Sequence, residues 1–315
     1  MIIQPLTATV STNLSKSNSM IKLQLSLLSI FLCLLIYGQA TPEEVRIAIA
    51  KSITDLKVRP EPVAFVNNDY VLSGRDSIAV RIYRPVAKNI LPVIYLVHGA
   101  GWVAGDLETH DNACRYFANK LQAIVVAVNY RRAPENKFPI PFNDSYLVLK
   151  WINVNMKKLK GNGKLILIGD SAGGQLVASI CLVNSKEKTP VPILTQVLIN
   201  PALNLSKGNV SYSTYPFFID WYLNISDSTD DIRISPLLAK DFSNIPPAII
   251  VVGEMDKIRK DGEEFNTKLL TAGINSSLYV QPKMGHLAGL FCAVSEKALP
   301  AMDFVVTKLK ELNIK

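Results

Sequence analysis

From Pro62 on, short apolar runs alternate with longer segments of helical periodicity. Several runs are apolar throughout, as expected of parallel strands that are covered on both faces. The runs predict strands over 77–83, 92–97, 123–128, 164–168, 193–199, 248–252 and 277–280. The segments between them predict helices over 111–121, 144–156, 173–184, 261–272 and 295–312. This alternation predicts an α/β sheet with helices on both faces.

Two segments do not fit this alternation. Residues 41–58 have a helical pattern and precede the first predicted strand, and residues 204–232 form a long interruption after a strand. The interruption is rich in aromatic residues: Tyr212, Tyr215, Phe217, Phe218, Trp221 and Tyr222. Connections of that length usually serve as functional loops or lids. We expect a cap formed from about 41–60 and 204–235, although the rings could equally pack against the main domain.

The N-terminus has the pattern of a targeting segment. Lys22 is followed by an apolar run over 25–36, and small residues at 38–40 precede Pro42 and two acids. A basic start, a short apolar core and a small-residue end are typical of a secretory signal peptide. A membrane span needs about 20 apolar residues, so a retained anchor is the second choice. We expect a leader over 1–40, cleavage after Ala40, and a secreted domain over 41–315.

The composition narrows the class of protein. Hydrophobic residues make up 49% of the chain and charged residues 19%, which indicates a globular domain with an ample core. The net charge is +8, but the basic residues are scattered, which favours a solvated surface over a nucleic-acid site. Membrane contact is expected to be weak unless the leader is kept. The cysteines lack metal-ligand spacing, so we expect small buried side chains and no metal site.

The strongest chemical signal is the run Gly169-Asp170-Ser171-Ala172-Gly173, which ends a strand and precedes a helical pattern. This is G-x-S-x-G in strand–turn–helix context. Gly169 and Gly173 let a sharp turn close, so that the Ser171 side chain projects at the carboxyl end of the sheet. A phosphate loop is the alternative, but neither a P-loop Lys-Ser/Thr nor G-x-G-x-x-G is present. The motif therefore predicts a nucleophilic serine.

A nucleophilic serine needs a base, and the chain has only three histidines. His286 comes on a loop after the strand that follows Asp256. The order serine, acid, histidine is that of α/β-hydrolases. Because each residue lies just past a strand, Ser171, Asp256 and His286 are predicted to meet at one edge of the sheet as a catalytic triad. Glu254 is the competing acid.

A second Gly-containing turn follows the strand 92–97, in His98-Gly99-Ala100-Gly101. Glycines at this point indicate that the backbone itself has a role, since they let it approach a ligand closely. His98 is less suited to be the base. We expect it either to pin the loop by hydrogen bonding or to pack as a structural histidine.

Five segments in order resemble the hormone-sensitive-lipase-like family of α/β-hydrolases: "HGAGW", "NYRRAPENKFPIPFND", "GDSAGG", "ISPLLAKDFSNIPPAIIVVGEMDKIRKDGEEF" and "MGHLAGLF". The resemblance covers the chain from about Ile78 to its end. It implies the α/β-hydrolase fold, a mostly parallel eight-stranded sheet with a helical cap, and ester hydrolysis without a cofactor. It also implies an oxyanion hole formed by the amides of Gly99, Ala100 and Ala172.

The sequence departs from the family pattern at four places. Ala100 replaces a glycine of the usual HGGG, and Arg132 replaces a leucine in the Y-R-L-A-P-E segment. Leu287 and Ala288 stand after His286 in place of Gly-Phe, and Lys260 replaces an acid. None of these changes removes a catalytic group, so they bear on substrate preference.

These features predict a serine carboxylesterase that hydrolyses small to medium acyl esters through an acyl-enzyme, with a small-molecule ester as its partner. An amide or carbohydrate deacetylase could use the same triad. A non-catalytic ligand-binding relative, or a basic surface that binds lipid or polysaccharide, is the alternative outside enzymes.

Overall fold

The computed structural model describes residues 40–87 and 89–314. The chain divides into two compact units, Met1–Val45 and Arg46–Lys315. Apart from Ala40, the expected leader lies outside the described residues. In the part of the chain that is described, no helix combines the length and the apolar character needed to cross a membrane. Helix α2 (Pro42–Thr54) confirms the helical pattern expected before the first strand.

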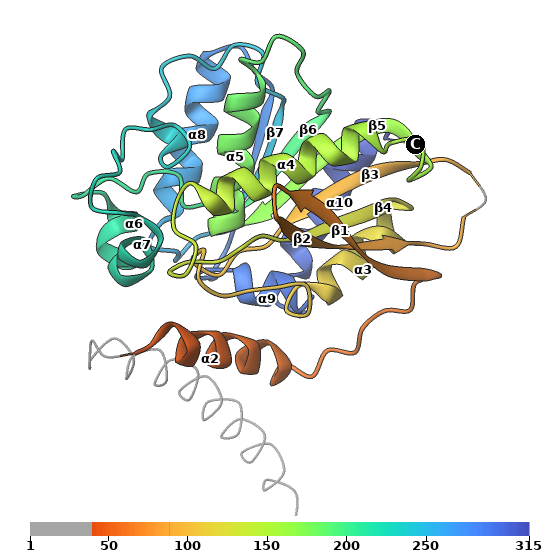
Figure 1. Ribbon diagram of the computed structural model, residues 1–315, viewed down its shortest axis with the longest axis horizontal. Helices are drawn as coiled ribbons and strands as arrows, with labels where there is room; N and C mark the ends of the chain where they lie inside the picture. Colours follow the sequence, from red (N-terminus) through yellow and green to blue (C-terminus); the bar gives the residue numbers. More distant parts are fainter. Residues whose placement is uncertain (1–39, 88, 315) are drawn as a thin grey trace, which may run out of the picture. The chain divides into compact units, whose positions relative to one another are not determined.

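One eight-stranded sheet forms the centre of the unit Arg46–Lys315 (Figure 1). The order across the sheet is β1-β2-β4-β3-β5-β6-β7-β8, and all pairs are parallel except β1 with β2 and β2 with β4. The strands are β1 (Phe65–Ser73), β2 (Asp76–Arg84), β3 (Leu91–Val97), β4 (Ile124–Asn129), β5 (Gly161–Asp170), β6 (Thr195–Ile199), β7 (Ala248–Gly253) and β8 (Ser276–Gln281). The mostly parallel α/β sheet is thus confirmed.

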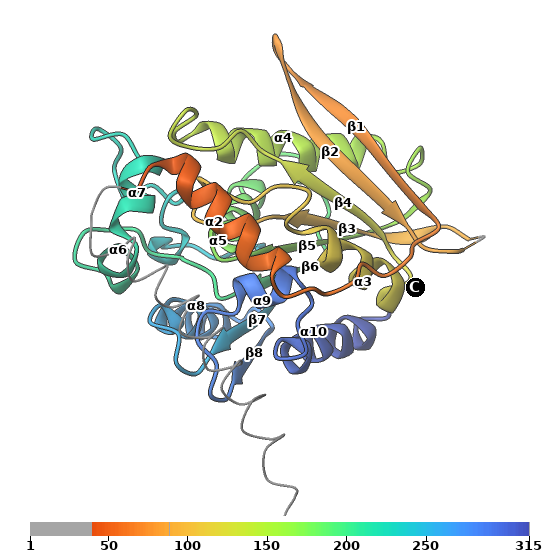
Figure 2. The same cartoon turned by 90° about the horizontal axis from the view of Figure 1, so that it is seen from below.

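The apolar strands are buried on both faces, as their composition predicts. Every residue of β3, β6 and β7 is buried. Helices α3 (Asp111–Leu121) and α10 (Leu299–Glu311) share a core with Ile94 and Leu96 on one face. Helices α4 (Ile140–Val154), α5 (Ala172–Asn184) and α8 (Arg259–Thr271) cover the other (Figures 1 and 2). Each fully buried aliphatic side chain contributes about 1.5–3 kcal/mol to folding.

Strand β1 was not predicted from the sequence. Its residues FVNNDYVLS are mostly exposed, so they lack the buried alternation by which a strand is recognised. Pairing makes it a strand, because its whole length from Phe65 to Ser73 lies opposite β2 in antiparallel register. The predicted helix over 295–312 was also too long: α10 begins at Leu299 with Pro300 in its first turn. A proline is accommodated there because the first turn lacks intrahelical acceptors.

The long aromatic interruption contains α6 (Val210–Thr214) and α7 (Pro216–Tyr222), followed by the short 3-10 helix η1 (Pro236–Leu238). Tyr222 is fully buried and stacks on Trp102, with ring centroids 4.6 Å apart. Part of the aromatic content therefore packs against the main domain. Tyr215 and Phe218 of the same segment contact His286 and Gly101, which are described below.

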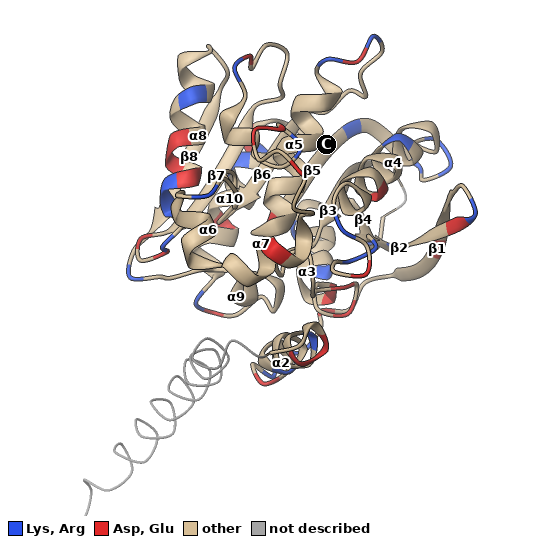
Figure 3. Cartoon of the chain, turned by 60° about the vertical axis from the view of Figure 1, so that its left-hand side comes forward, with Lys and Arg blue, Asp and Glu red and all other residues tan. Residues whose placement is uncertain are grey.

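Charged residues of both signs occur beside one another along the elements, for example on α8 (Figure 3). On this helix Arg259 and Glu263 form an ion pair of 3.1 Å one turn apart. Three basic residues of α8 are balanced by three acidic ones, so this helix carries no net positive charge.

Candidate active site

Ser171 occupies a sharp turn between β5 and α5. Its φ of 51° and ψ of −116° lie outside the ordinary regions for a residue with a side chain. Its N–H donates to the carbonyl of Ile199 at 2.8 Å, and its own carbonyl accepts from Gln175 at 3.0 Å. These bonds hold the strained conformation, and they leave the hydroxyl at the carboxyl end of the sheet.

The glycines of the motif are required by close backbone approach. A Cβ atom on Gly169 would lie 2.3 Å from the carbonyl oxygen of Gly173. A Cβ atom on Gly173 would lie 2.1 Å from the carbonyl oxygen of Val97. The turn therefore closes against itself and against the end of β3, which brings the His98-Gly99 segment beside Ser171.

The structure brings Ser171, His286 and Asp256 together from three loops. Nε2 of His286 lies 3.0 Å from Oγ of Ser171, and Nδ1 lies 2.8 Å from Oδ2 of Asp256. A carboxylate can only accept, so the ring holds its proton on Nδ1 and presents an unprotonated Nε2 to the serine. This is the arrangement in which a histidine can take the serine proton.

Asp256 is buried and remains ionised. Burial alone would raise the pKa of its carboxyl, but the charge and hydrogen bond of His286 lower it, helped by the N–H of Ile258 and the amide of Asn200. The balance places the pKa below its usual value. Glu254, the competing acid, is instead exposed and accepts from the N–H of Lys283 at 2.6 Å. The geometry thus selects Asp256 as the partner of His286.

The backbone beside Ser171 supplies free donors, but not all those that we expected. Gly99 donates its N–H to Oδ1 of Asp170 at 3.0 Å, so this amide is already bonded and the expectation for Gly99 is corrected. Among the described residues, no acceptor takes the N–H of Ala100, Gly101 or Ala172. Gly101, expected only to support the turn, therefore takes the place of Gly99 as a candidate donor.

Gly99 has a different reason to be glycine. A Cβ atom at this position would lie 2.4 Å from Oδ2 of Asp170, so only glycine allows the loop to reach that carboxylate. The sequence could not reveal this, because the direction of the Asp170 side chain is set by the tertiary structure.

His98 is a structural histidine. Its ring stacks on Tyr130 with centroids 4.1 Å apart, and Nδ1 lies 3.0 Å from the carbonyl oxygen of Gly99. Burial, together with the charge of His110, lowers its pKa to about 3, so the ring is neutral. It both packs and holds the loop, and the two interpretations offered by the sequence describe one role.

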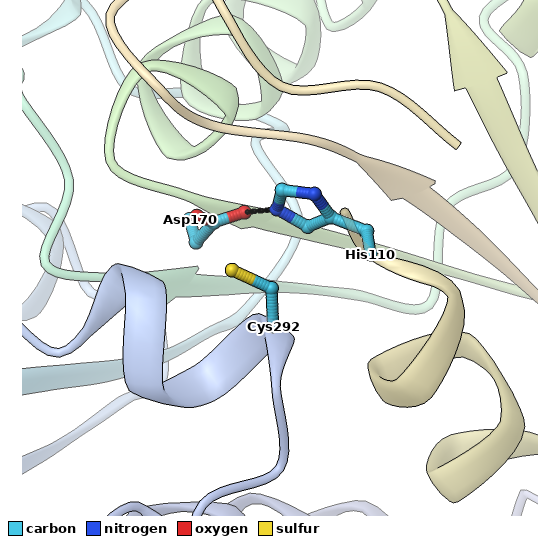
Figure 4. Close-up of side chains that lie close together, drawn as sticks. All are labelled: His110, Asp170 and Cys292. Carbon is cyan, nitrogen blue, oxygen red and sulfur yellow. Dashed lines mark hydrogen bonds and ion pairs between the residues drawn. The ribbon is translucent and has the colours of Figure 1, made fainter. Parts of the chain in front are cut away.

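His110, Asp170 and Cys292 form a buried cluster that sequence reasoning missed (Figure 4). Nε2 of His110 lies 3.0 Å from Oδ1 of Asp170, and Nδ1 lies 3.0 Å from the hydroxyl of Thr109. Burial opposes the charged ring, but Cys292 and Asp170 raise the pKa of His110 well above its usual value. Asp170 and His110 therefore form a buried ion pair directly behind the serine turn.

This cluster has the residue types of a metal site, and its ligand atoms lie within 4.8 Å of one another. Both ring nitrogens of His110 and Oδ1 of Asp170 already have partners within the protein. The cluster is thus satisfied as a hydrogen-bonded ion pair. Its position in the fold, with Asp170 bonded to Gly99, gives it the effect of tying the loop at 98–101 to the serine turn.

Aromatic residues from the α6–α7 segment lie on two sides of the site. The ring of Tyr215 is 5.8 Å from the ring of His286. The ring of Phe218 packs on Gly101, where an added Cβ would lie 2.4 Å from Cδ1. Phe217 contacts Phe218 with centroids 4.3 Å apart. Apolar rings therefore lie beside His286 and beside the loop at 98–101, while the side chain of His286 stays 25% exposed.

Comparison with known proteins agrees with this geometry. Residues 93–289 match the family model described as the alpha/beta hydrolase fold. The chain is 33% identical over 253 residues to carboxylesterase NlhH of Mycobacterium tuberculosis. The aligned region covers 75% of this chain and 79% of NlhH. An arylesterase of Saccharolobus solfataricus is 32% identical to the chain over 208 residues. The aligned region covers 62% of this chain and 67% of the arylesterase.

Solved structures show the same likeness. A hyperthermophilic esterase from Pyrobaculum calidifontis superimposes with a TM-score of 0.80 and 32% identity, over 87% of this chain and 95% of that one. The thermostable carboxylesterase EstE1, from a metagenomic library, superimposes with a TM-score of 0.82 and 28% identity. The match covers 88% of this chain and 98% of EstE1. The similarity extends over nearly the whole of these enzymes.

Proposed function

The chain belongs to the hormone-sensitive-lipase-like family of α/β-hydrolases, and from this premise we propose that it is a serine carboxylesterase that acts through Ser171, His286 and Asp256. The observation that carries the proposal is the hydrogen-bonded series from the Ser171 hydroxyl through both nitrogens of His286 to Asp256. Its relatives NlhH and EstE1 bear the name carboxylesterase, which supports ester hydrolysis. The substrate is a small-molecule ester.

The reaction follows from the contacts. Nε2 of His286 takes the proton of Ser171 as Oγ attacks the ester carbonyl, and Asp256 stabilises the resulting imidazolium. The N–H groups of Ala100, Gly101 and Ala172 bind the oxyanion, and each such donor typically stabilises the transition state by about 2.7–4 kcal/mol. His286 then protonates the leaving alcohol. Water, activated by the same ring, releases the acid from the acyl-enzyme.

The aromatic rings of the α6–α7 segment support a preference for small to medium acyl groups. Tyr215 lies beside His286 and Phe218 packs on Gly101, in contact with Phe217, so bulky rings stand next to both the base and the candidate oxyanion donors. Ala100 adds a methyl group where the family usually has glycine. An amide or carbohydrate deacetylase would use the same triad and is the second candidate.

The test is a panel of p-nitrophenyl esters of graded acyl length, with an acetanilide and an acetylated sugar for comparison. Ser171→Ala is expected to lower kcat by at least about a thousandfold, because it removes the nucleophile. A fluorophosphonate should label the wild type at Ser171, as seen by mass spectrometry. An inactive wild type without the adduct would point to a ligand-binding protein, and equal activity of the variant would exclude Ser171 as nucleophile.

We propose in addition that residues 1–40 are a signal peptide that directs secretion. The support is the sequence pattern of the leader alone: Lys22, the apolar run over 25–36 and the small residues before Pro42. The mature protein recovered outside the producing cells should begin at Thr41, which N-terminal sequencing determines. A recovered chain that still begins at Met1 or Met20 would favour a retained anchor instead.

A further inference from the structure

Asn200 links the two residues that we propose to activate Ser171. It follows directly after β6 and is 1% exposed. Its Nδ2 donates to Oδ2 of Asp256, and its Oδ1 accepts from the N–H of Leu287 at 3.2 Å. One amide side chain thus bonds the carboxylate of Asp256 and the residue after His286.

The two partners fix the orientation of this amide. A carboxylate only accepts hydrogen bonds and a backbone N–H only donates, so the reversed orientation of Asn200 would lose both bonds. The backbone is held as well, since its N–H donates to the carbonyl of Val251 at 2.7 Å. The φ of Asn200 is 45°, a left-handed value that asparagine tolerates better than most residues. Residue type and backbone therefore both suit the bridging position.

The bonds of Asp256 show what Asn200 contributes. Oδ2 accepts from both Asn200 and Nδ1 of His286, whereas Oδ1 accepts from the N–H of Ile258 at 3.1 Å. Within the described part of the chain, Asn200 is the uncharged side chain that donates to Asp256. A second donor on the same oxygen draws negative charge away from the contact with His286, and so weakens the hold of the carboxylate on a protonated ring.

Among the described residues, the ionisable groups near this pair come from the α6–α7 segment and from the loop and helix after β7. From the α6–α7 segment, Tyr215 lies beside His286, and burial together with the charge of Asp256 raises the pKa of its hydroxyl, so it stays neutral. Glu254 binds the N–H of Lys283 and the Arg259 side chain binds the carbonyl of Glu254. The charge felt by His286 is therefore governed by Asp256 and by what bonds to Asp256.

We propose that Asn200 is a positioning residue that orients Asp256 and the His286 loop, and that sets how readily His286 gives up its proton. The inference rests on the proposed function, since it assigns Asn200 a role in the same reaction. Without the amide, Oδ2 of Asp256 concentrates its charge on His286, and the loop at Leu287 loses its anchor. The protonated ring, which cannot act as a base, becomes more stable.

The experiment compares Asn200→Asp and Asn200→Ala with the wild type. Asn200→Asp has nearly the same shape and keeps an acceptor for Leu287, but it places a second carboxyl group against Asp256. We expect the acidic limb of the kcat/KM profile for p-nitrophenyl acetate, measured from about pH 4.5 to about pH 9, to move to higher pH by about one unit in Asn200→Asp. Asn200→Ala should show a smaller shift and a loss of about tenfold at neutral pH.

Asn184 provides a matched control. It is also a buried asparagine, and its amide donates to the carbonyl of Val191 and accepts from the N–H of the same residue, both at 2.9 Å. It lies at the end of α5 and bonds no member of the triad. Asn184→Ala should lower the stability to denaturant but leave the acidic limb in place. Unshifted limbs in both Asn200 variants, or an equal shift in Asn184→Ala, would overturn the proposal.

A second readout separates this inference from the proposed function. In the Ser171→Ala protein, NMR follows the titration of the His286 ring without any turnover. Adding Asn200→Asp to this background should move the titration midpoint to higher pH, and an unchanged midpoint counts against the role of Asn200. If the wild type hydrolyses none of the esters, the proposed function fails, while the NMR result still decides what Asn200 does.

Discussion

At the scale of single residues, the loop beside Ser171 is unusual in its backbone. Ala100, Gly101 and Trp102 have φ values of 77°, 64° and 60°, so three successive residues are left-handed. Each such residue with a side chain costs roughly 1–2 kcal/mol. The loop is held in this form by the Asp170–Gly99 bond and by Trp102, whose Nε1 donates to Gln175 at 2.9 Å. A substitution in this loop that disfavours the left-handed conformation will therefore displace the backbone N–H groups that we propose to bind the oxyanion.

Gly101→Ala should reduce activity more than it reduces stability. The added Cβ would lie 2.4 Å from the ring of Phe218, so the ring or the loop must move. We expect kcat/KM for p-nitrophenyl acetate to fall by at least about tenfold, since each oxyanion donor is worth more than that. The measurement is steady-state kinetics alongside thermal unfolding.

Gly74→Ala is the control for this change. Gly74 has a similar φ of 61°, but a Cβ there meets nothing within 4 Å. It should lose stability through backbone strain and keep full activity. Equal kinetic losses in both variants would contradict the specific role of Gly101, whereas partial recovery in Gly101→Ala with Phe218→Ala would support it.

At this scale, the sequence was enough to predict site residues that are defined by their type and by their place on the sheet. It was not enough for residues whose role depends on the direction of a side chain. Ser171, Asp256 and His286 each follow a strand, so the fold alone brings them to one edge. Asn200 also follows a strand, but nothing in its neighbours distinguishes a bridging amide from an ordinary loop residue. Gly99 was misassigned because its amide is taken by Asp170, a contact that depends on how the loop at 98–101 folds back.

At the scale of elements, the crossover after β4 depends on an ion pair between a buried carboxylate and a partly exposed arginine. Asp144 of α4 is fully buried and accepts from Nε of Arg131 at 2.9 Å and from its second guanidinium nitrogen at 2.8 Å. It also accepts from the backbone N–H of Arg131 at 3.0 Å. One carboxylate thus fixes the start of α4 to the segment that leaves β4.

Asp144→Ala should therefore lower the free energy of unfolding by about 2–3 kcal/mol, because hydrogen bonds to a buried carboxylate are lost while Arg131, whose side chain is 29% exposed, keeps its ion pair with Asp76. Urea denaturation measures the change. Asp55→Ala removes an exposed pair with Lys51, whose charged atoms are 2.8 Å apart, and should cost less than about 1 kcal/mol. Similar losses of unfolding free energy in the two variants would show that the Asp144 pair contributes no more than an exposed ion pair.

Whether a strand could be predicted from the sequence depends on how much of it is buried. Parallel strands such as β3 and β7 have apolar residues at every position, because helices cover both faces. The edge strand β1 has no such requirement, since most of it faces solvent, and only its register with β2 defines it. The composition of the buried strands was therefore enough to predict them, whereas the exposed edge strand β1 could not be predicted from its residues.

At the scale of the whole molecule, two buried groups give the stability opposite dependences on pH. His98 has a pKa lowered by burial to about 3, so its contribution is present above its usual value of 6.5 and is lost as the pH falls below it. Asp261 has a pKa raised to about 6, because burial outweighs the hydrogen bonds from Ser211, Leu203 and Asn204. Its folded form holds a proton more tightly than the unfolded chain, so stability falls as the pH rises.

Asp261→Asn should isolate the second contribution. The wild type is expected to lose up to about 3 kcal/mol from this group as the pH rises from about 4 to about 7, and no more above that. The variant keeps an acceptor but has no proton to lose. Its stability relative to the wild type should be greater at about pH 7.5 than at about pH 4.5, as measured by urea denaturation at each pH. A difference independent of pH would contradict this assignment.

The Ser171 hydroxyl and its base are 115 residues apart in the chain, and the β7 and β8 loops complete the site. During synthesis the serine turn is made long before His286, and domains fold as units, with their non-local strand pairings the slow step. A growing chain therefore contains a finished nucleophile motif that has no partner to deprotonate it. The complete triad therefore exists only once the loop after β8 has been made and has packed beside the serine turn.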